Sequence, residues 1–158
     1  MTLTSIPNAD ISRMSSEMKR MTEEGMGSFN VRKLAENAIA GHEDKILAIY
    51  DYLKRWPYIP DPVGKELLIS PNRQAEDFLT KGEIHGGDCD DLAMLSAAVL
   101  GSIGYKVRIV IASYRFDREF EHAYTEVWVE DSWFNFDLSS SRPLGWITPT
   151  TKEIHIEF

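Results

Sequence analysis

The chain of 158 residues contains a single cysteine, Cys89, whose neighbours give its thiol a possible chemical role. Cys89 opens a run of mostly small or apolar residues that favours a helix beginning directly after Asp88. The unpaired amides of a first helical turn stabilise a thiolate and so lower the pKa of the thiol. The alternative is a small buried hydrophobic residue, because free cysteine is among the most buried residue types. Taken alone, Cys89 fits this second interpretation better.

Two carboxylates next to the thiol are predicted to cap the same helix. Asp88 can accept from the first-turn amides while Asp91 reaches back to the amide of Asp88, as in an acidic capping box. Gly104 is placed to end the helix, as glycine does after a C-cap. We therefore assign Asp88 and Asp91 to supporting the helix rather than to chemistry.

A predicted hairpin after this helix carries a histidine and an aspartate. If Glu130 and Asp131 form a two-residue turn, position 129 faces 132 and Asp137 faces Tyr124. His122 and Asp137 then lie on one face of the sheet as diagonal neighbours, at a separation that polar side chains can close. A slip of one residue would place them on opposite faces.

Together Cys89, His122 and Asp137 supply the parts of a thiol-nucleophile triad, which are attack, proton transfer and orientation of the imidazole. Each residue also has a purely structural interpretation. His122 can be a hydrogen-bonded strand histidine, and Asp137 can cap a turn or strand end. The joint arrangement favours the triad over three independent structural roles.

The rest of the chain predicts an α+β protein, with helices packed on one face of an antiparallel sheet. Residues 1–28 form a polar, flexible or partly helical arm, in which Met14, Met18 and Met21 share one helical face, and residues 29–158 form one domain. Expected helices cover 31–40 after an N-cap at Asn30, then 43–56, 73–80 and 89–103. Expected strands cover 105–113, 122–129, 132–139 and 154–158.

Three motifs in this order resemble the transglutaminase-like branch of the papain-fold cysteine enzymes. They are GGDCDDLAMLSAAVLGSIGYKVRIV, then EHAYTEVWV, then WFNFDLS. The family has a G-D-C-x-D box that opens the central helix, followed by an H-A-x-x-E-V strand and a W-x-x-x-D strand. Upstream, ILAIYDYLKRWPYIPDPVGKELLISP is similar to the family's approach to the cysteine. The resemblance covers Val31 to Ser139, and the compact form also resembles copies carried by phages and prophages.

The resemblance implies a papain-like fold with Cys89 as nucleophile, His122 as general base and then acid, and Asp137 as the orienting residue. It implies attack on an amide or peptide bond through a thioester, more often by a peptidase or amidase than by a cross-linking enzyme. The backbone amide of Cys89 is one expected oxyanion donor. An upstream side chain commonly adds another, for which Gln74 and Trp56 are the candidates. Glu126 receives a supporting role.

Composition limits the other function classes. With 17 basic and 25 acidic residues the net charge is −8, which disfavours nucleic-acid binding. No apolar run approaches the roughly 20 residues that span a bilayer, and no secretory signal is visible, so we expect a cytoplasmic protein, or a virion-associated one if phage-encoded. The single cysteine excludes an internal disulfide.

Metal sites and binding modules are the remaining alternatives. His42, His85, His122 and His155 lack zinc-site spacing, so we expect no metal and no other cofactor. The expected partner is a protein or peptide substrate. A non-enzymatic structural or binding module that retained this fold stays open, docking a partner through the N-terminal arm or the charged loop 114–121.

Overall fold

The computed structural model of the protein describes residues 8–62, 67–116 and 120–158. Helices come first in the chain and strands follow, which confirms the predicted α+β class. The helices are α1 (Asn8–Met26), α2 (Phe29–Ile39), α3 (Lys45–Leu53), α4 (Pro71–Lys81) and α5 (Cys89–Ser102). The strands are β1 (Val107–Ser113), β2 (His122–Val129), β3 (Ser132–Phe136) and β4 (Lys152–Glu157). Within the described residues, no helix has the length and apolar character needed to cross a bilayer.

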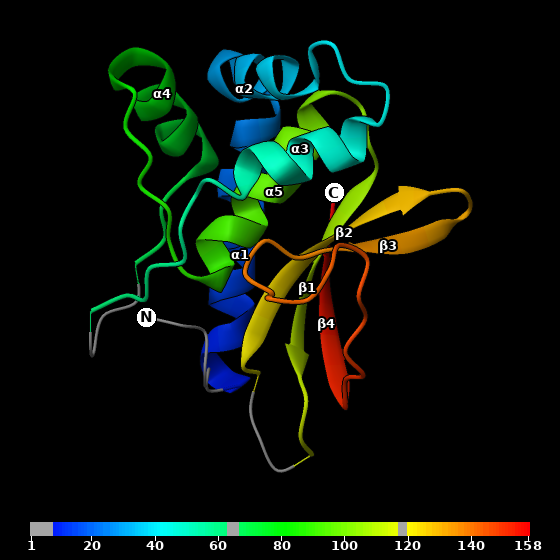
Figure 1. Ribbon diagram of the computed structural model, residues 1–158. Coiled ribbons are helices and arrows are strands. Elements are labelled where there is room, and N and C mark those ends of the chain that lie inside the picture. Colours follow the sequence, from blue (N-terminus) through cyan, green and yellow to red (C-terminus); the bar gives the residue numbers. More distant parts are fainter. Residues whose placement is uncertain (1–7, 63–66, 117–119) are drawn as a thin grey trace.

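Helix α5 forms the centre of the molecule, as its nearly continuous small and apolar sequence predicts. Residues 89–100 are all buried. The other four helices contact α5, and β1 and β2 pack against it as well (Figure 1). A hydrogen bond of 2.7 Å from Thr125 Oγ1 to the carbonyl oxygen of Ala93 joins β2 directly to α5. The core therefore lies between the helices and one face of the sheet.

The sheet is antiparallel with the strand order β3-β2-β1-β4. In the β2–β3 hairpin Val129 pairs with Ser132, and the register continues to Thr125 opposite Phe136. Glu130 and Asp131 have φ of 50° and 62°, the left-handed values that a two-residue hairpin turn requires. The turn and the register predicted from the sequence are both confirmed.

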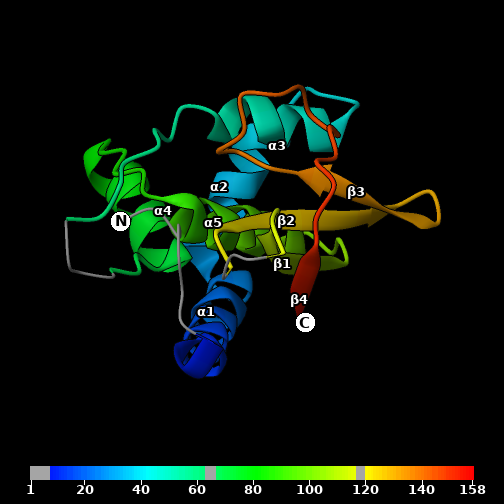
Figure 2. The same ribbon diagram turned by 90° about the horizontal axis from the view of Figure 1, so that it is seen from below.

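The N-terminal segment, which we expected to be a flexible or partly helical arm, is helical from residue 8. Residues 8–26 form α1, a helix packed along α5 (Figure 2). The predicted methionine face is present, and Met18 is fully buried. A Cβ added at Gly25 would lie 2.9 Å from the Cβ of Ala98, so glycine at this position lets the two helices approach closely. The expected docking role of the arm remains a proposal, and residues 1–7 lie outside the described ranges.

The N-cap predicted for α2 was wrong. Ser28, not Asn30, caps the helix, since Ser28 Oγ accepts from the amide of Val31 and donates to Asn72 Oδ1 at 2.5 Å. A serine accepts first-turn amides as well as asparagine does, and here it gains a long-range partner besides. The predicted helix 43–56 is shortened to α3, because Asp44 is its N-cap.

Helix α4 and the strands differ from the predictions only at their ends. Helix α4 starts at Pro71, which needs no amide partner in the first turn, and it is capped by Ser70. The segment between α3 and α4 contains no helix or strand among its described residues, as its prolines predict. The element order of the prediction is therefore correct throughout the described chain.

Candidate active site

Cys89 is the first residue of α5, and its neighbours form the predicted capping box. Asp88 Oδ1 accepts from the amides of Asp90 and Asp91 at 3.1 and 3.4 Å. The amide of Asp88 in turn donates to Asp91 Oδ2 at 3.2 Å. The amide of Ile69 donates to the other oxygen of Asp91 at 2.8 Å. The capping prediction is confirmed, and Asp91 also anchors the chain that leads into α4.

The thiol lies in a buried and acidic environment. Cys89 is 2% exposed, and its Sγ donates to Asp90 Oδ1 across 3.7 Å. Burial, followed by the charge on Asp91, raises the pKa of Asp88 to about 7. Burial also raises the pKa of Asp91. These carboxylates oppose a negative thiolate, whereas the helix amides favour one.

The loop before Cys89 is tied to the segment that follows α3. The amide of Gly87 donates to the carbonyl oxygen of Pro57 at 3.1 Å, and the amide of Ile59 donates to that of Gly87 at 2.7 Å. These bonds place Tyr58 opposite Gly87 in a short parallel bridge. Burial, followed by a negative charge on Cys89, raises the pKa of Tyr58 to about 12. Tyr58 therefore stays a neutral phenol near the thiol.

The hairpin brings the predicted histidine and aspartate into contact. His122 Nε2 lies 2.7 Å from Asp137 Oδ2. The other oxygen of Asp137 accepts from the amide and the hydroxyl of Ser139 at 3.0 and 2.8 Å. Burial alone would raise the pKa of Asp137, but the hydrogen bonds from His122 and Ser139 outweigh it, so the pKa is lowered. Asp137 is thus an anion that holds Nε2 of the imidazole.

Two tyrosine rings lie against the His122 imidazole. The ring of Tyr124 stacks on it at 5.7 Å with an interplanar angle of 28°. The ring of Tyr114 lies 6.0 Å from it at 34°. Burial, followed by nearby negative charge, raises the pKa of both phenols. No sequence motif indicated a role for these tyrosines, although Tyr124 shares the strand face of His122 by alternation.

A cavity of about 680 Å³ opens beside the His122 and Asp137 pair. Its wall is mainly polar and is made of Tyr114, Arg115, Glu121, His122, Asp137, Ser139, Ser140, Ser141 and Thr148. Cys89 is not among the described residues that line this cavity. The cavity is therefore adjacent to the histidine and aspartate, whereas Cys89 is buried.

Helix α5 and strand β2 place Cys89 and His122 at the same end of the core. Each is the first residue of its element. Both views show α5 and β2 running in the same general direction from this end (Figures 1 and 2). The ring of Tyr114 packs on the imidazole of His122 at this end. The arrangement can thus supply a nucleophile, a base and an orienting carboxylate.

The other residues named from the sequence lie in different surroundings. Glu126 shares the strand face of His122, but its contact is an ion pair with Arg108 at 2.7 Å. Gln74 is fully buried on α4, and neither amide atom has a hydrogen-bond partner among the described residues. The indole nitrogen of Trp56 is likewise buried and without such a partner. Both oxyanion candidates thus keep an unused polar group.

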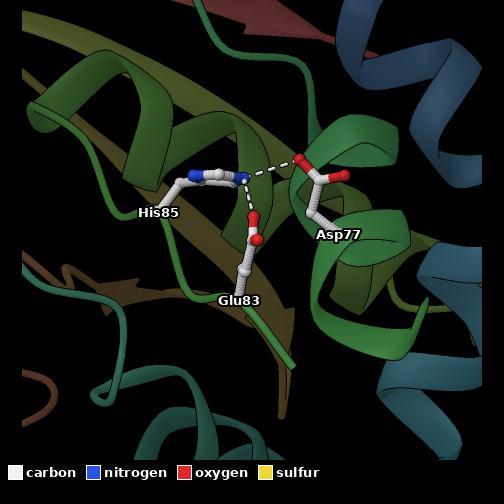
Figure 3. A group of neighbouring side chains, drawn as sticks. All are labelled: Asp77, Glu83 and His85. Carbon is white, nitrogen blue, oxygen red and sulfur yellow. Dashed lines mark hydrogen bonds and ion pairs between the residues drawn. The ribbon is translucent and has the colours of Figure 1, made fainter. Parts of the chain in front are cut away.

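Among the residues that the structure describes, two groups of side chains have the atoms to hold a cation. One is Asp61 with Asp88 and Asp91, close to Cys89. The other is Asp77, Glu83 and His85, in which His85 Nε2 lies between the two carboxylates (Figure 3). Neither group is evident from the sequence. Asp61 is far from Asp88 and Asp91 in the chain, and the loop after α4 must turn back to bring His85 onto Asp77.

Helices around a buried Cys-bearing helix, on one face of an antiparallel sheet with a His and Asp hairpin, define a papain-like α+β fold. Residues 31–138 match the model of the transglutaminase-like superfamily. Since the match covers more than half of the chain, the protein belongs to this superfamily. The resemblance read from the three motifs is thereby confirmed.

Solved structures with this fold are distant in sequence. One is a candidate cysteine protease from Cytophaga hutchinsonii, 21% identical, with a TM-score of 0.53 over 87% of this chain and 46% of that chain. Another is LapG from Legionella pneumophila, 19% identical, with a TM-score of 0.51 over 80% of this chain and 75% of that one. The chain thus spans less than half of the Cytophaga protein. Among curated proteins, none matches the chain.

Proposed function

We propose that the protein is a cysteine-nucleophile acyl-transfer enzyme that acts on an amide or peptide bond, as a peptidase or amidase. The observation that carries the proposal is the contact of His122 with Asp137, at the end of the core where Cys89 opens α5. Nε2 of the imidazole is held by Asp137, which leaves Nδ1 to exchange a proton with the thiol. The predicted substrate is a protein or peptide.

The proposed reaction has two halves. In the first, the Cys89 thiolate attacks the acyl carbon, and protonated His122 gives its proton to the departing amine as the carbon–nitrogen bond breaks. This leaves a thioester on Cys89. In the second, His122 takes a proton from water as the water oxygen attacks the thioester. Cys89 then leaves as a thiolate beside protonated His122, and the carboxylic acid is released. An amine in place of the water would complete a transamidation.

One observation favours the alternative of a non-enzymatic structural or binding module. The thiol of Cys89 is 2% exposed and Cys89 does not line the described cavity. A cysteine buried in this way behaves as a small hydrophobic residue unless the residues that cover it move. The two proposals predict different behaviour of the thiol in the folded protein.

The rate of alkylation by iodoacetamide as a function of pH distinguishes them. An ordinary thiol has a pKa of about 8.5. We expect the alkylation rate of the folded protein to rise with pH and to show an inflection well below a pH of about 8.5. In His122→Ala the inflection should move up toward that pH. A normal inflection that His122→Ala leaves in place would contradict the enzyme. Acyl-enzymes trapped on Cys89 from native lysate, then identified by mass spectrometry, would name the substrate.

Of the two oxyanion candidates, we assign the role to Trp56. It directly precedes Pro57, whose carbonyl oxygen is bonded to Gly87, two residues before Cys89. We expect Trp56→Phe to slow acylation by p-nitrophenyl acetate about 10²-fold, since removal of one oxyanion donor typically costs this much. Phenylalanine keeps a ring against Phe78, which lies 5.2 Å from Trp56 between ring centroids.

Gln74→Met is the matched variant. It should acylate at the wild-type rate and raise the free energy of unfolding by roughly 1 kcal/mol, because a buried amide without partners is replaced by an apolar chain. The unfolding change is measured by urea titration. The opposite pattern, with Gln74→Met inactive and Trp56→Phe active, would transfer the role to Gln74.

A further inference from the structure

A second histidine and aspartate pair lies upstream of Cys89, on the loop that leads into α5. His85 Nε2 is 2.6 Å from Asp77 Oδ2, and the side chain of Asp77 is only 5% exposed (Figure 3). His85 is 35% exposed and lies four positions before Cys89. Its only other ion-pair neighbour among the described residues is Glu83, at 3.7 Å.

Asp77 is a fixed anion on α4. Arg73 Nε donates to Asp77 Oδ2 at 2.7 Å, and Lys81 Nζ lies 3.6 Å from Oδ1. Hydrogen bonds from Arg73 and then from His85 lower the pKa of Asp77 to about 2. Two cations therefore already neutralise this carboxylate, which makes the group a poor site for a metal ion. The amide of Glu83 also donates to the carbonyl oxygen of Asp77. The loop that follows α4 is therefore bonded to Asp77 through the backbone as well as through His85.

The loop between α4 and α5 is thus held at two places. The first is the bond between the side chains of His85 and Asp77. The second is the pair of backbone bonds that tie Gly87 to Pro57 and Ile59. Gly86 lies between these two places with a φ of 72°, a conformation that favours glycine. Directly after the second place, Asp88 caps α5 and Cys89 begins the helix.

We infer that His85 is a positioning residue that, through its bond to Asp77, fixes the loop that sets Cys89 against the first turn of α5 and the His122 imidazole. This inference rests on the proposed function and extends it to a residue outside the triad. The ion-pair contacts of His85 among the described residues are with Asp77 and Glu83, so we assign it positioning rather than contact with the reacting atoms. Its effect arises because both stabilisers of a thiolate, the helix amides and an imidazolium, depend on where the sulfur is held.

The test measures the inflection of iodoacetamide alkylation against pH in four proteins. We expect His85→Ala to move the inflection up by about one pH unit, since it frees the loop. His85→Gln, whose amide can donate to Asp77 from a similar place, should restore the wild-type inflection. Glu83→Ala is the matched control, because it removes the weaker neighbour of His85 and should change nothing.

Urea unfolding of the same proteins separates positioning from stabilisation. A lower unfolding midpoint for His85→Ala with an unmoved inflection would overturn the inference, since the residue would then only stabilise the fold. A low wild-type inflection that His85→Ala leaves in place would likewise overturn the inference and leave the proposed function standing. A wild-type inflection near the ordinary thiol pKa of about 8.5 would overturn both this inference and the proposed function.

Discussion

Asp137→Asn is expected to fold and to lose most of its turnover. Hydrolysis of p-nitrophenyl acetate should slow by on the order of 10²- to 10⁴-fold, the range that general acid–base catalysis contributes. The wild-type carboxylate accepts a hydrogen bond from Nε2 of His122 at 2.7 Å, which in the proposed mechanism leaves Nδ1 to act on the thiol. An asparagine can present its NH₂ group to Nε2 instead, which favours the wrong tautomer.

The variant separates orientation from packing because it keeps the shape of the side chain. Ser139 can still donate to Oδ1 of an asparagine, so the hairpin end keeps its hydrogen bonds. Circular dichroism and urea titration should give a nearly wild-type fold. Ser139→Ala is the control, since it removes one donor to Asp137 and leaves the carboxylate on His122. An unfolded Asp137→Asn, or one with normal turnover, would assign Asp137 a structural role.

The pH dependence of stability provides a second measurement on the same variant. The pKa of Asp137 is lower in the folded protein than in the unfolded chain. The folded state then binds fewer protons, so Asp137 contributes stability above the ordinary aspartate pKa of about 3.9, and loses it as the pH falls through the lowered value. We expect the acid limb of the stability curve to be shallower in Asp137→Asn than in the wild type.

The candidate site was predictable to the extent that local rules determine it. The capping box depends on two residues three positions apart, and Asp88 and Asp91 have this spacing and form the box. The contact of His122 with Asp137 depends on a register, and the two-residue turn at Glu130 and Asp131 sets that register with no freedom to slip. Each of these features needs only the residues that flank it.

What the sequence could not predict depends on contacts between distant segments. Residues 8–26 are polar on average, and the burial of α1 depends on its packing against α5, through the face that carries Met14 and Met18 and through the close approach at Gly25. The bond of His85 to Asp77 crosses from a loop to α4, and no local rule pairs them. The burial of Cys89 is also a tertiary property, since it depends on which segments cover the start of α5.

Gly86→Ala is expected to have the largest effect on stability. Gly86 has a φ of 72°, and a Cβ added there would overlap the carbonyl oxygen of Pro57 and lie 2.8 Å from the Cδ of its ring. That carbonyl oxygen also accepts the bond from Gly87 that ties the loop beside Cys89. Any movement that relieves the overlap must therefore break the hydrogen bond from Gly87 to Pro57. We expect a loss on the order of 3 kcal/mol in the free energy of unfolding.

Gly82→Ala isolates the part of this loss that comes from backbone conformation alone. Gly82 has a φ of 70°, almost the same value, but an added Cβ would meet nothing within 4 Å. It should cost only about 1 kcal/mol, the strain of a side chain in the left-handed region. Urea titration of both variants gives the difference, which measures the contact of Gly86 with Pro57. Equal losses would mean that the loop relaxes freely, and that the close approach of Gly86 to Pro57 does not hold Cys89 in place.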